Sequence, residues 1–214
     1  NSAKGYDLFG KAIIKILNKY PEWKAIVIGD EPREKIYFNH KNLEIIGFQH
    51  HSKVLDIFEK THIAVVCSRW EEPFGRTSLE AASRGCAVII SNKGGLPETI
   101  TNGVILRNLK IKTLYNAIEN LIKDKSARTI LQKSSLKNFY LTDKFISKKI
   151  DVYRDKLNTI SSFKYVNKNN EHLKILHVTN FNERHNGRLF YNTGRRINNG
   201  LTRLNHSVLD FSDR

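Results

Sequence analysis

The first 160 residues alternate short apolar runs with amphipathic helical segments, and this order constrains the fold more than any other feature. Five apolar runs, at 24–29, 43–48, 63–67, 87–91 and 104–106, lack the alternating polar pattern of a half-exposed strand. Such runs are typical of strands buried on both faces of a parallel sheet. The sequence therefore predicts an α/β fold, a Rossmann-like parallel sheet with helices on both faces.

Helical periodicity fills the gaps between these strands. Helices are predicted at 7–19, 52–60 and 76–84, and Ser52 is the expected N-cap of the second of them. From residue 111 almost to residue 158 the pattern is again helical, as expected for helices that pack on the sheet or on a partner domain.

The strand–helix pattern stops and then restarts near the C-terminus. Residues 161–171 contain few apolar side chains and no periodicity, which predicts a linker. Residues 172–214 then show a strand, a polar loop, a helix and a strand, a partial second Rossmann-like β–α–β unit. We therefore divide the chain into a domain at 1–160, a linker and a second unit. Because the chain contains no Met and starts with Asn1, we expect a fragment truncated at both ends.

The net charge of +15 allows two interpretations. It could attract nucleotide diphosphates, anionic lipid or nucleic acid, or it could reflect a lysine-rich composition that solvates helices. The basic residues are spread along the chain, not gathered in a stripe with aromatic residues, which argues against nucleic acid. Cys67 and Cys86 adjoin apolar strands, which predicts buried free thiols in a reducing cytoplasm. No apolar run approaches the roughly 20 residues that span a bilayer.

Two carboxylates, Glu72 and Glu80, lie on either side of a glycine-containing turn that leads into a helix. The turn follows the apolar run at 63–67, so these side chains belong at the carboxyl edge of the sheet, where open α/β folds bind ligands. Carboxylates beside an anion site are understandable if they accept hydrogen bonds from the hydroxyls of a sugar or ribose. For Glu80 a structural role is equally open, because 77–80 has the Ser/Thr-x-x-Glu pattern of a capping box.

The same turn is expected to offer backbone donors. Arg76 or Thr77 should open the helix, so that the N–H groups of Phe74, Gly75 and Arg76 face the cleft unpaired. A diphosphate would satisfy these groups and meet the positive end of the helix. Gly75 would permit the close approach of the backbone that a side chain would block.

The longer segment 68–98 resembles the donor-binding signature of family 4 retaining glycosyltransferases. The paired glutamates, the Phe74-Gly75 pair, Gly85 and the segment 94–98 occur in the family's order and at its spacing. The resemblance covers about residues 4 to 157 and implies the GT-B architecture, two Rossmann-like domains facing across a cleft. This chain would contain the C-terminal donor domain without its first strand, and 172–214 resembles the start of another GT-B unit, with the loop 179–188 at its cleft.

The resemblance implies roles for individual residues. Glu72 is similar to the family glutamate that contacts hydroxyls of the transferred sugar, and Glu80 to the glutamate that holds the ribose. Lys4 resembles the family lysine that contacts the diphosphate. Backbone amides of Phe74 and Gly75 would face the sugar or the phosphate.

Two further positions, Gly29 and Phe48, lie at strand ends that flank the base in such proteins. The chain departs from the family pattern because the arginine that usually precedes the Lys-Gly pair is absent, and because 29–31 lacks a second glycine. As a dinucleotide-binding fingerprint this segment fails.

The resemblance also implies the reaction. Lys4 and the helix start would stabilise the departing diphosphate without a metal, and no Asp-x-Asp motif occurs in the chain. We expect no cofactor, a nucleotide-diphosphate sugar as the donor, and a glycan or lipid-linked acceptor in the intact protein. Other expected partners are an N-terminal GT-B domain and, peripherally, an anionic membrane at its cytoplasmic face, but not nucleic acid. The isolated chain is predicted to be inactive.

Other interpretations of the chain remain open. A domain that binds nucleotide-sugar without catalysis is the first alternative, and a basic module that binds nucleic acid or anionic membrane is the second. His50 and His51 are interpreted as a polar start of a helix, not a metal site. Trp70 either lines the cleft or packs, and Arg69 and Lys93 are assigned to the surface in preference to the anion site.

Overall fold

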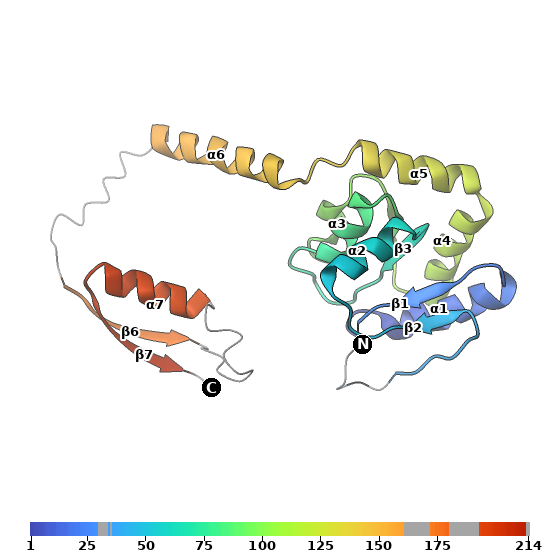
Figure 1. The fold of residues 1–214 in the computed structure, drawn as a ribbon, viewed down its shortest axis with the longest axis horizontal. Coiled ribbons are helices and arrows are strands. Elements are labelled where there is room, and N and C mark those ends of the chain that lie inside the picture. The colour runs from blue at the N-terminus through green and yellow to red at the C-terminus, as the bar shows by residue number, and fades with distance from the viewer. Residues whose placement is uncertain (30–33, 35, 161–171, 180–192, 213–214) are drawn as a thin grey trace. The chain divides into compact units, whose positions relative to one another are not determined.

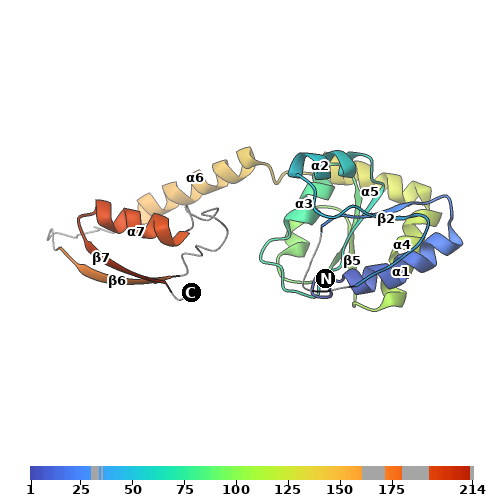
Figure 2. The same ribbon diagram turned by 60° about the horizontal axis from the view of Figure 1, so that its bottom comes forward.

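The computed structural model describes residues 1–29, 34, 36–160, 172–179 and 193–212 (Figures 1 and 2). The chain divides into two compact units, Asn1–Ile150 and Asp151–Arg214. The predicted linker at 161–171 and nearly all of the predicted loop at 179–188 lie outside the described residues.

The first unit contains every strand and helix predicted for it, and the α/β fold with parallel strands and flanking helices is confirmed. Its strands are β1 Ala25–Val27, β2 Leu43–Ile45, β3 Ile63–Val66, β4 Ala87–Ser91 and β5 Val104–Leu106. Its helices are α1 Tyr6–Lys19, α2 His51–Glu59, α3 Arg76–Ser83, the 3₁₀ helix η1 Leu96–Thr99, α4 Ile111–Lys123 and α5 Lys125–Lys137. Helix α6, Asp143–Ile160, follows and continues past the end of the unit.

Strand β4 is the middle strand of a parallel three-stranded sheet, β3-β4-β5. All five of its residues are buried. Ala87 and Ile89 belong to the core that α1 and α4 complete, whereas Val88 and Ile90 belong to the core on the side of α2 and α3. This burial on both faces explains why the apolar run shows no alternation.

Strands β1 and β2 form a separate parallel pair, and in the described part of the chain β1 pairs with β2 alone and β3 with β4 alone. A cavity is lined by the consecutive residues 22–29 on one side and 60–68 on the other. Successive side chains of a strand point to opposite faces, so a cavity that contacts all of them lies along the strand edges. The unpaired edges of β1 and β3 therefore face one space, where the family resemblance expects a further strand.

Two details of the helices differ from the predictions. Helix α2 begins at His51, and Ser52 does not cap it, because the extended His50 is the N-cap and its carbonyl oxygen already accepts from Val54 N at 3.1 Å. The long helical stretch is broken at Asp124, whose side chain accepts from Ala127 N at 2.8 Å and caps α5.

The second unit contains β6 Lys174–Thr179, α7 Thr193–Arg203 and β7 Ser207–Ser212. The two strands pair in parallel from Lys174↔Ser207 to Thr179↔Ser212. This is the predicted β–α–β order. Among the helices of the described residues, none is long and apolar enough to cross a membrane.

Candidate functional site

The cavity along the strand edges extends to the carboxyl ends of the strands and has a volume of about 1720 Å³. Seven of the eight residues expected at the site line it: Lys4, Gly29, Phe48, Glu72, Gly75, Arg76 and Glu80. Phe74, the eighth, is not among the lining residues, and it is 52% exposed. The fold thus gathers residues from four separate segments at one edge, as parallel strands require.

Lys4 and Glu72 form an ion pair in this cavity, with 2.5 Å between Lys4 Nζ and Glu72 Oε1. Lys4 comes from the loop before α1 and Glu72 from the loop after β3. The lysine side chain is 56% exposed, whereas that of the glutamate is 14% exposed. The cation is therefore the more exposed partner of the pair.

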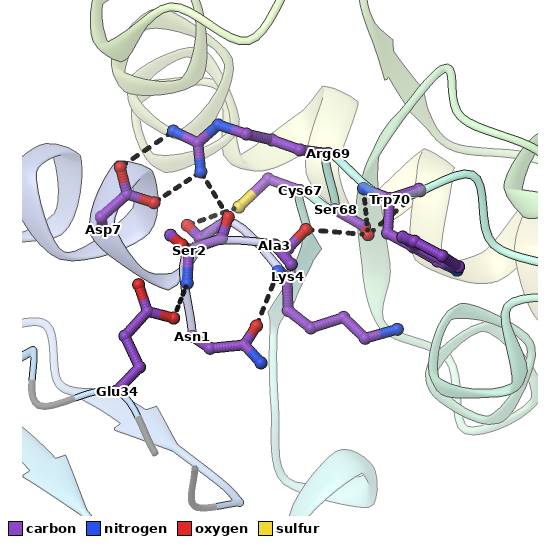
Figure 3. Close-up of polar contacts among 11 residues, drawn as sticks. Asn1, Ser2, Ala3, Lys4, Asp7, Glu34, Cys67, Ser68, Arg69 and Trp70 are labelled. Atoms are coloured by element: carbon purple, nitrogen blue, oxygen red, sulfur yellow. Dashed lines mark hydrogen bonds and ion pairs between the residues drawn. The ribbon is translucent and has the colours of Figure 1, made fainter. Parts of the chain in front are cut away.

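The loop that carries Lys4 is fastened to the end of β3 (Figure 3). Ala3 O accepts from Arg69 N at 2.8 Å and from Trp70 N at 3.2 Å, and Lys4 N donates to Asn1 Oδ1 at 2.9 Å. Gly5, with a φ of 78°, allows the tight approach, because a Cβ there would lie 2.1 Å from Cys67 O. These contacts fix the backbone of Lys4 beside the strand whose following loop carries Glu72.

Arg69 is the second fastening of the same loop (Figure 3). Its guanidinium binds Asp7 bidentately, at 2.5 Å to Oδ1 and 2.9 Å to Oδ2, and donates to Ser2 O at 2.6 Å. The hydrogen bond from Arg69 lowers the pKa of Asp7, and the same bond raises the pKa of Arg69. The guanidinium thus positions the loop, a more specific role than the surface position assigned to Arg69 from the sequence.

Glu71 holds the loop that carries Glu72. Its carboxylate receives Lys93 Nζ at 2.6 Å and Gly94 N at 2.6 Å, and these bonds lower the pKa of Glu71. Gly94, with a φ of 53°, packs so closely that a Cβ would lie 2.2 Å from Glu72 O. Gly95 N also donates to Glu72 O, at 2.7 Å. The Gly94-Gly95 pair therefore packs against the backbone of Glu72 and holds it by a hydrogen bond.

The start of α3 provides backbone donors at the cavity. Gly75 is its N-cap with a φ of 91°, and a Cβ on Gly75 would lie 2.6 Å from Leu96 Cδ2. The helix begins at Arg76, as expected. Within the described residues, the backbone N–H groups of Phe74, Gly75 and Arg76 donate no hydrogen bond. Unpaired amides at a helix start favour an anion.

Glu80 does not cap its own helix. The helix begins before Thr77, with no side-chain cap, and Glu80 Oε1 instead receives Arg76 Nε at 2.5 Å and lies 2.8 Å from His51 Nε2. The capping-box interpretation is therefore wrong: the residues of the pattern are present, but the turn at Gly75 starts the helix two residues too early for Thr77 to cap it. The carboxylate faces the cavity.

The carboxyl ends of β1 and β2 supply the remaining wall. Gly29 N donates to Gly47 O at 2.7 Å, which joins the turns that follow the two strands. Phe48 is 72% exposed, and its ring meets that of His50 edge to face at 6.0 Å between centroids. An exposed aromatic ring beside a cavity is suited to a flat ligand group.

Sequence reasoning missed three residues that organise the site: His51, Asp7 and Glu71. His51 contacts Glu80 across 29 positions and Asp7 contacts Arg69 across 62, so no local pattern could pair them. Cys67 and Cys86 are buried and free, as predicted, and burial raises their pKa values to about 11 and about 12. Among the described residues, no group of three or more His, Cys, Asp or Glu side chains is placed to hold a metal ion.

Comparison with known proteins identifies the family. A family model described as glycosyl transferases group 1 matches residues 1–137. The chain belongs to this family. The match covers the Lys4 loop, both glutamates and the strands of the first unit.

Three relatives illustrate the similarity. One subunit of human phosphatidylinositol N-acetylglucosaminyltransferase is 29% identical over 65% of this chain and 30% of its own length. The lipopolysaccharide core biosynthesis mannosyltransferase LpsB of Rhizobium meliloti is 31% identical over 47% of this chain and 31% of its own length. The crystal structure of the C-terminal domain of LpcC, a glycosyl transferase group 1 family protein from Francisella tularensis, matches with a TM-score of 0.58. It is 28% identical, over 64% of this chain and 78% of that one. The chain thus spans about a third of the two full-length relatives.

Proposed function

We propose that the Asn1–Ile150 unit binds a nucleotide-diphosphate sugar at the carboxyl edge of its strands. The whole protein would then transfer the sugar to an acceptor hydroxyl with retention of the anomeric configuration. The supporting observation is that Lys4, Glu72, Glu80 and the start of α3 line one cavity in a chain of the glycosyl transferases group 1 family. Each of these groups suits a different part of such a donor.

The diphosphate would lie between Lys4 and the start of α3. Cleavage of the sugar–phosphate bond places negative charge on the departing diphosphate, and fixed donors stabilise that charge without a metal ion. Lys4 and the unpaired amides of Gly75 and Arg76 are suited to this task. An exposed ion pair is worth only about 0–1 kcal/mol, so a diphosphate would readily draw Lys4 away from Glu72.

The hydroxyl groups of the donor would meet the two glutamates. Glu72, freed from Lys4, would accept hydrogen bonds from the sugar, and Glu80 would accept them from the ribose. The base would lie at the wall formed by Gly29 and Phe48. The glutamates would act as hydrogen-bond acceptors, a role each carboxylate already has toward a cation, Glu72 toward Lys4 and Glu80 toward Arg76.

The acceptor is proposed from the relatives. The names of two of them concern phosphatidylinositol, a lipid, and the core of lipopolysaccharide, a glycan carried on lipid. We therefore propose a hexosyl donor and a lipid-linked or envelope glycan acceptor, which the whole protein would reach from the cytoplasmic side. The net charge of +15 would assist peripheral contact with an anionic membrane.

Titration calorimetry of the whole protein with UDP- and GDP-sugars tests donor binding. Wild type should bind one of them, and Lys4→Ala and Glu80→Ala should each weaken that binding by at least about tenfold, the effect of about one lost charge-assisted contact. Unchanged affinity in both variants would contradict the proposed site. Binding without sugar transfer would support a non-catalytic domain, and steeply salt-dependent binding to DNA or liposomes alone would support the basic-module alternative.

A further inference from the structure

His51 links the start of α2 to the carboxylate of Glu80 in α3. Its Nε2 lies 2.8 Å from Glu80 Oε1 and 3.2 Å from Arg76 Nη2. All three side chains line the same cavity. Because Arg76 and Glu80 are one turn apart on the same helix, their ion pair holds the carboxylate only to its own helix. Of the polar contacts that the Glu80 side chain makes with described residues, only the one with His51 joins its carboxylate to a different element.

The two oxygens of Glu80 are used unequally. Oε1 takes both contacts, from Arg76 Nε at 2.5 Å and from His51, whereas Oε2 has no hydrogen-bond partner among the described residues. The Glu80 side chain is 17% exposed, so its remaining freedom is small. A carboxylate fixed through one oxygen presents the other in a defined direction, which is what a ligand hydroxyl requires.

We infer that His51 is a positioning residue of the donor site: its Nε2–H donates to Glu80 Oε1 and aims Oε2 at the ribose hydroxyls of the nucleotide. A carboxylate can only accept, so the 2.8 Å contact places the ring proton on Nε2 of His51, as its donor to Glu80 Oε1. A nitrogen that donates this proton cannot also accept from Arg76 Nη2, which lies farther away, at 3.2 Å. The inference rests on the proposed function. It gives His51 a role beyond its place as the first residue of α2.

The position of His51 in the chain adds a second consequence. It lies three residues after Phe48, which with Gly29 forms the wall proposed for the base. Helices α2 and α3 share an apolar core that includes Phe58, Ala81 and Ala82, and Val54 and Leu55 of α2 pack against this core. The contact between His51 and Glu80 therefore links the carboxylate proposed to bind the ribose to the chain segment that carries Phe48, in the wall proposed for the base.

The test compares two probes that differ only in the ribose hydroxyls. The whole protein is titrated with UDP and with 2′,3′-dideoxyuridine 5′-diphosphate, or with the guanosine pair if GDP is the nucleotide that binds. In wild type the ribonucleotide should bind more tightly. His51→Ala should weaken ribonucleotide binding on the order of five- to tenfold, as the loss of about one hydrogen bond to a charged group predicts, and leave dideoxynucleotide binding unchanged.

Three variants make the result decisive. His51→Gln keeps a donor and should restore most of the ribose preference, whereas His50→Ala, which removes the neighbouring ring, should leave the difference between the two probes as in wild type. Glu80→Ala should abolish the preference, and adding His51→Ala to it should have no further effect. If Glu80→Ala abolishes the preference and His51→Ala does not, the role of His51 is refuted while the proposed function stands. If Glu80→Ala also leaves it intact, the ribose role of Glu80 in the proposed function fails.

Discussion

Lys4 and Glu72 lie 68 positions apart in the sequence, yet Lys4 Nζ is 2.5 Å from Glu72 Oε1. Each backbone is fixed by a different set of contacts: Ala3 O binds the amides after β3, and Glu72 O binds Gly95 N. The side chains meet because the loop before α1 is hydrogen-bonded to the backbone that follows β3, and Glu72 lies in that same following loop. The pair thus places the two residues assigned to catalysis next to each other.

Lys4→Ala should reduce kcat by on the order of 10²–10³-fold, because it removes a fixed charge from the departing diphosphate. The melting temperature should change little, since exposed ion pairs are worth about 0–1 kcal/mol. Steady-state kinetics and calorimetric melting of the whole protein measure the two effects. Arg84→Ala is the matched control, because it breaks an ion pair with Glu59 away from the cavity and should leave kcat unchanged. A Lys4→Ala enzyme with full kcat would exclude Lys4 from the chemistry.

Much of the first unit could be predicted from the sequence because its signals are local. The run 87–91 was predicted to its ends, since burial on both faces leaves an uninterrupted apolar pattern. The turn before α3 was predictable for the same reason, as Gly75 is needed at a φ of 91°.

The contacts that arrange the site could not be predicted, because they join distant segments. Nothing near Asp7 indicates that it binds Arg69, and nothing near His51 indicates Glu80. The capping-box pattern at 77–80 failed for a related reason: the tertiary fit of Gly75 against Leu96 determines where α3 begins. Local propensity was overridden by packing.

Glu119→Gln should change how the free energy of unfolding depends on pH. Glu119 Oε1 receives Lys19 Nζ at 2.7 Å and the hydroxyls of Tyr20 and Tyr115 at 2.9 Å each, which ties α1 to α4. These bonds, led by that from Lys19, lower the pKa of Glu119 to about 2. A depressed carboxyl pKa stabilises the fold above the ordinary value of 4.5, and this contribution is lost as pH falls toward 2.

Urea unfolding at a series of pH values tests this prediction. Wild type should be more stable than Glu119→Gln at pH 7, and the two curves should converge as pH falls from about 4.5 toward 2. Lys19→Met, which removes the largest cause of the shift, should show a shallower loss than wild type over the same range. Parallel curves for wild type and Glu119→Gln would show that the network does not couple protonation to folding.

Gly94→Ala should destabilise the protein more than Gly47→Ala. Both glycines have positive φ, 53° and 63°, so both variants bear a strain of about 1–2 kcal/mol. At Gly47 a Cβ meets nothing within 4 Å, whereas at Gly94 it would lie 2.2 Å from Glu72 O. Overpacking of this kind adds about 1–3 kcal/mol. Denaturant unfolding measures the difference in the free energy of unfolding. Equal destabilisation of the two variants would show that the Glu72 loop moves to accommodate the added Cβ without cost.

Residue-resolved hydrogen exchange should show whether a strand lies between β1 and β3 in the whole protein. Ala25 N donates to Asn42 O and Gly29 N to Gly47 O, so these amides point to the β2 side. The intervening Ile26 amide points the opposite way, into the cavity. If the polypeptide that leads into Asn1 supplies a parallel strand there, the Ile26 amide should exchange at least about tenfold more slowly in the whole protein than in residues 1–214, a gain of about 1.4 kcal/mol in local protection. The Ala25 amide, already bonded, is the internal control. Equal protection of Ile26 in both proteins would show that the edge of β1 stays unpaired.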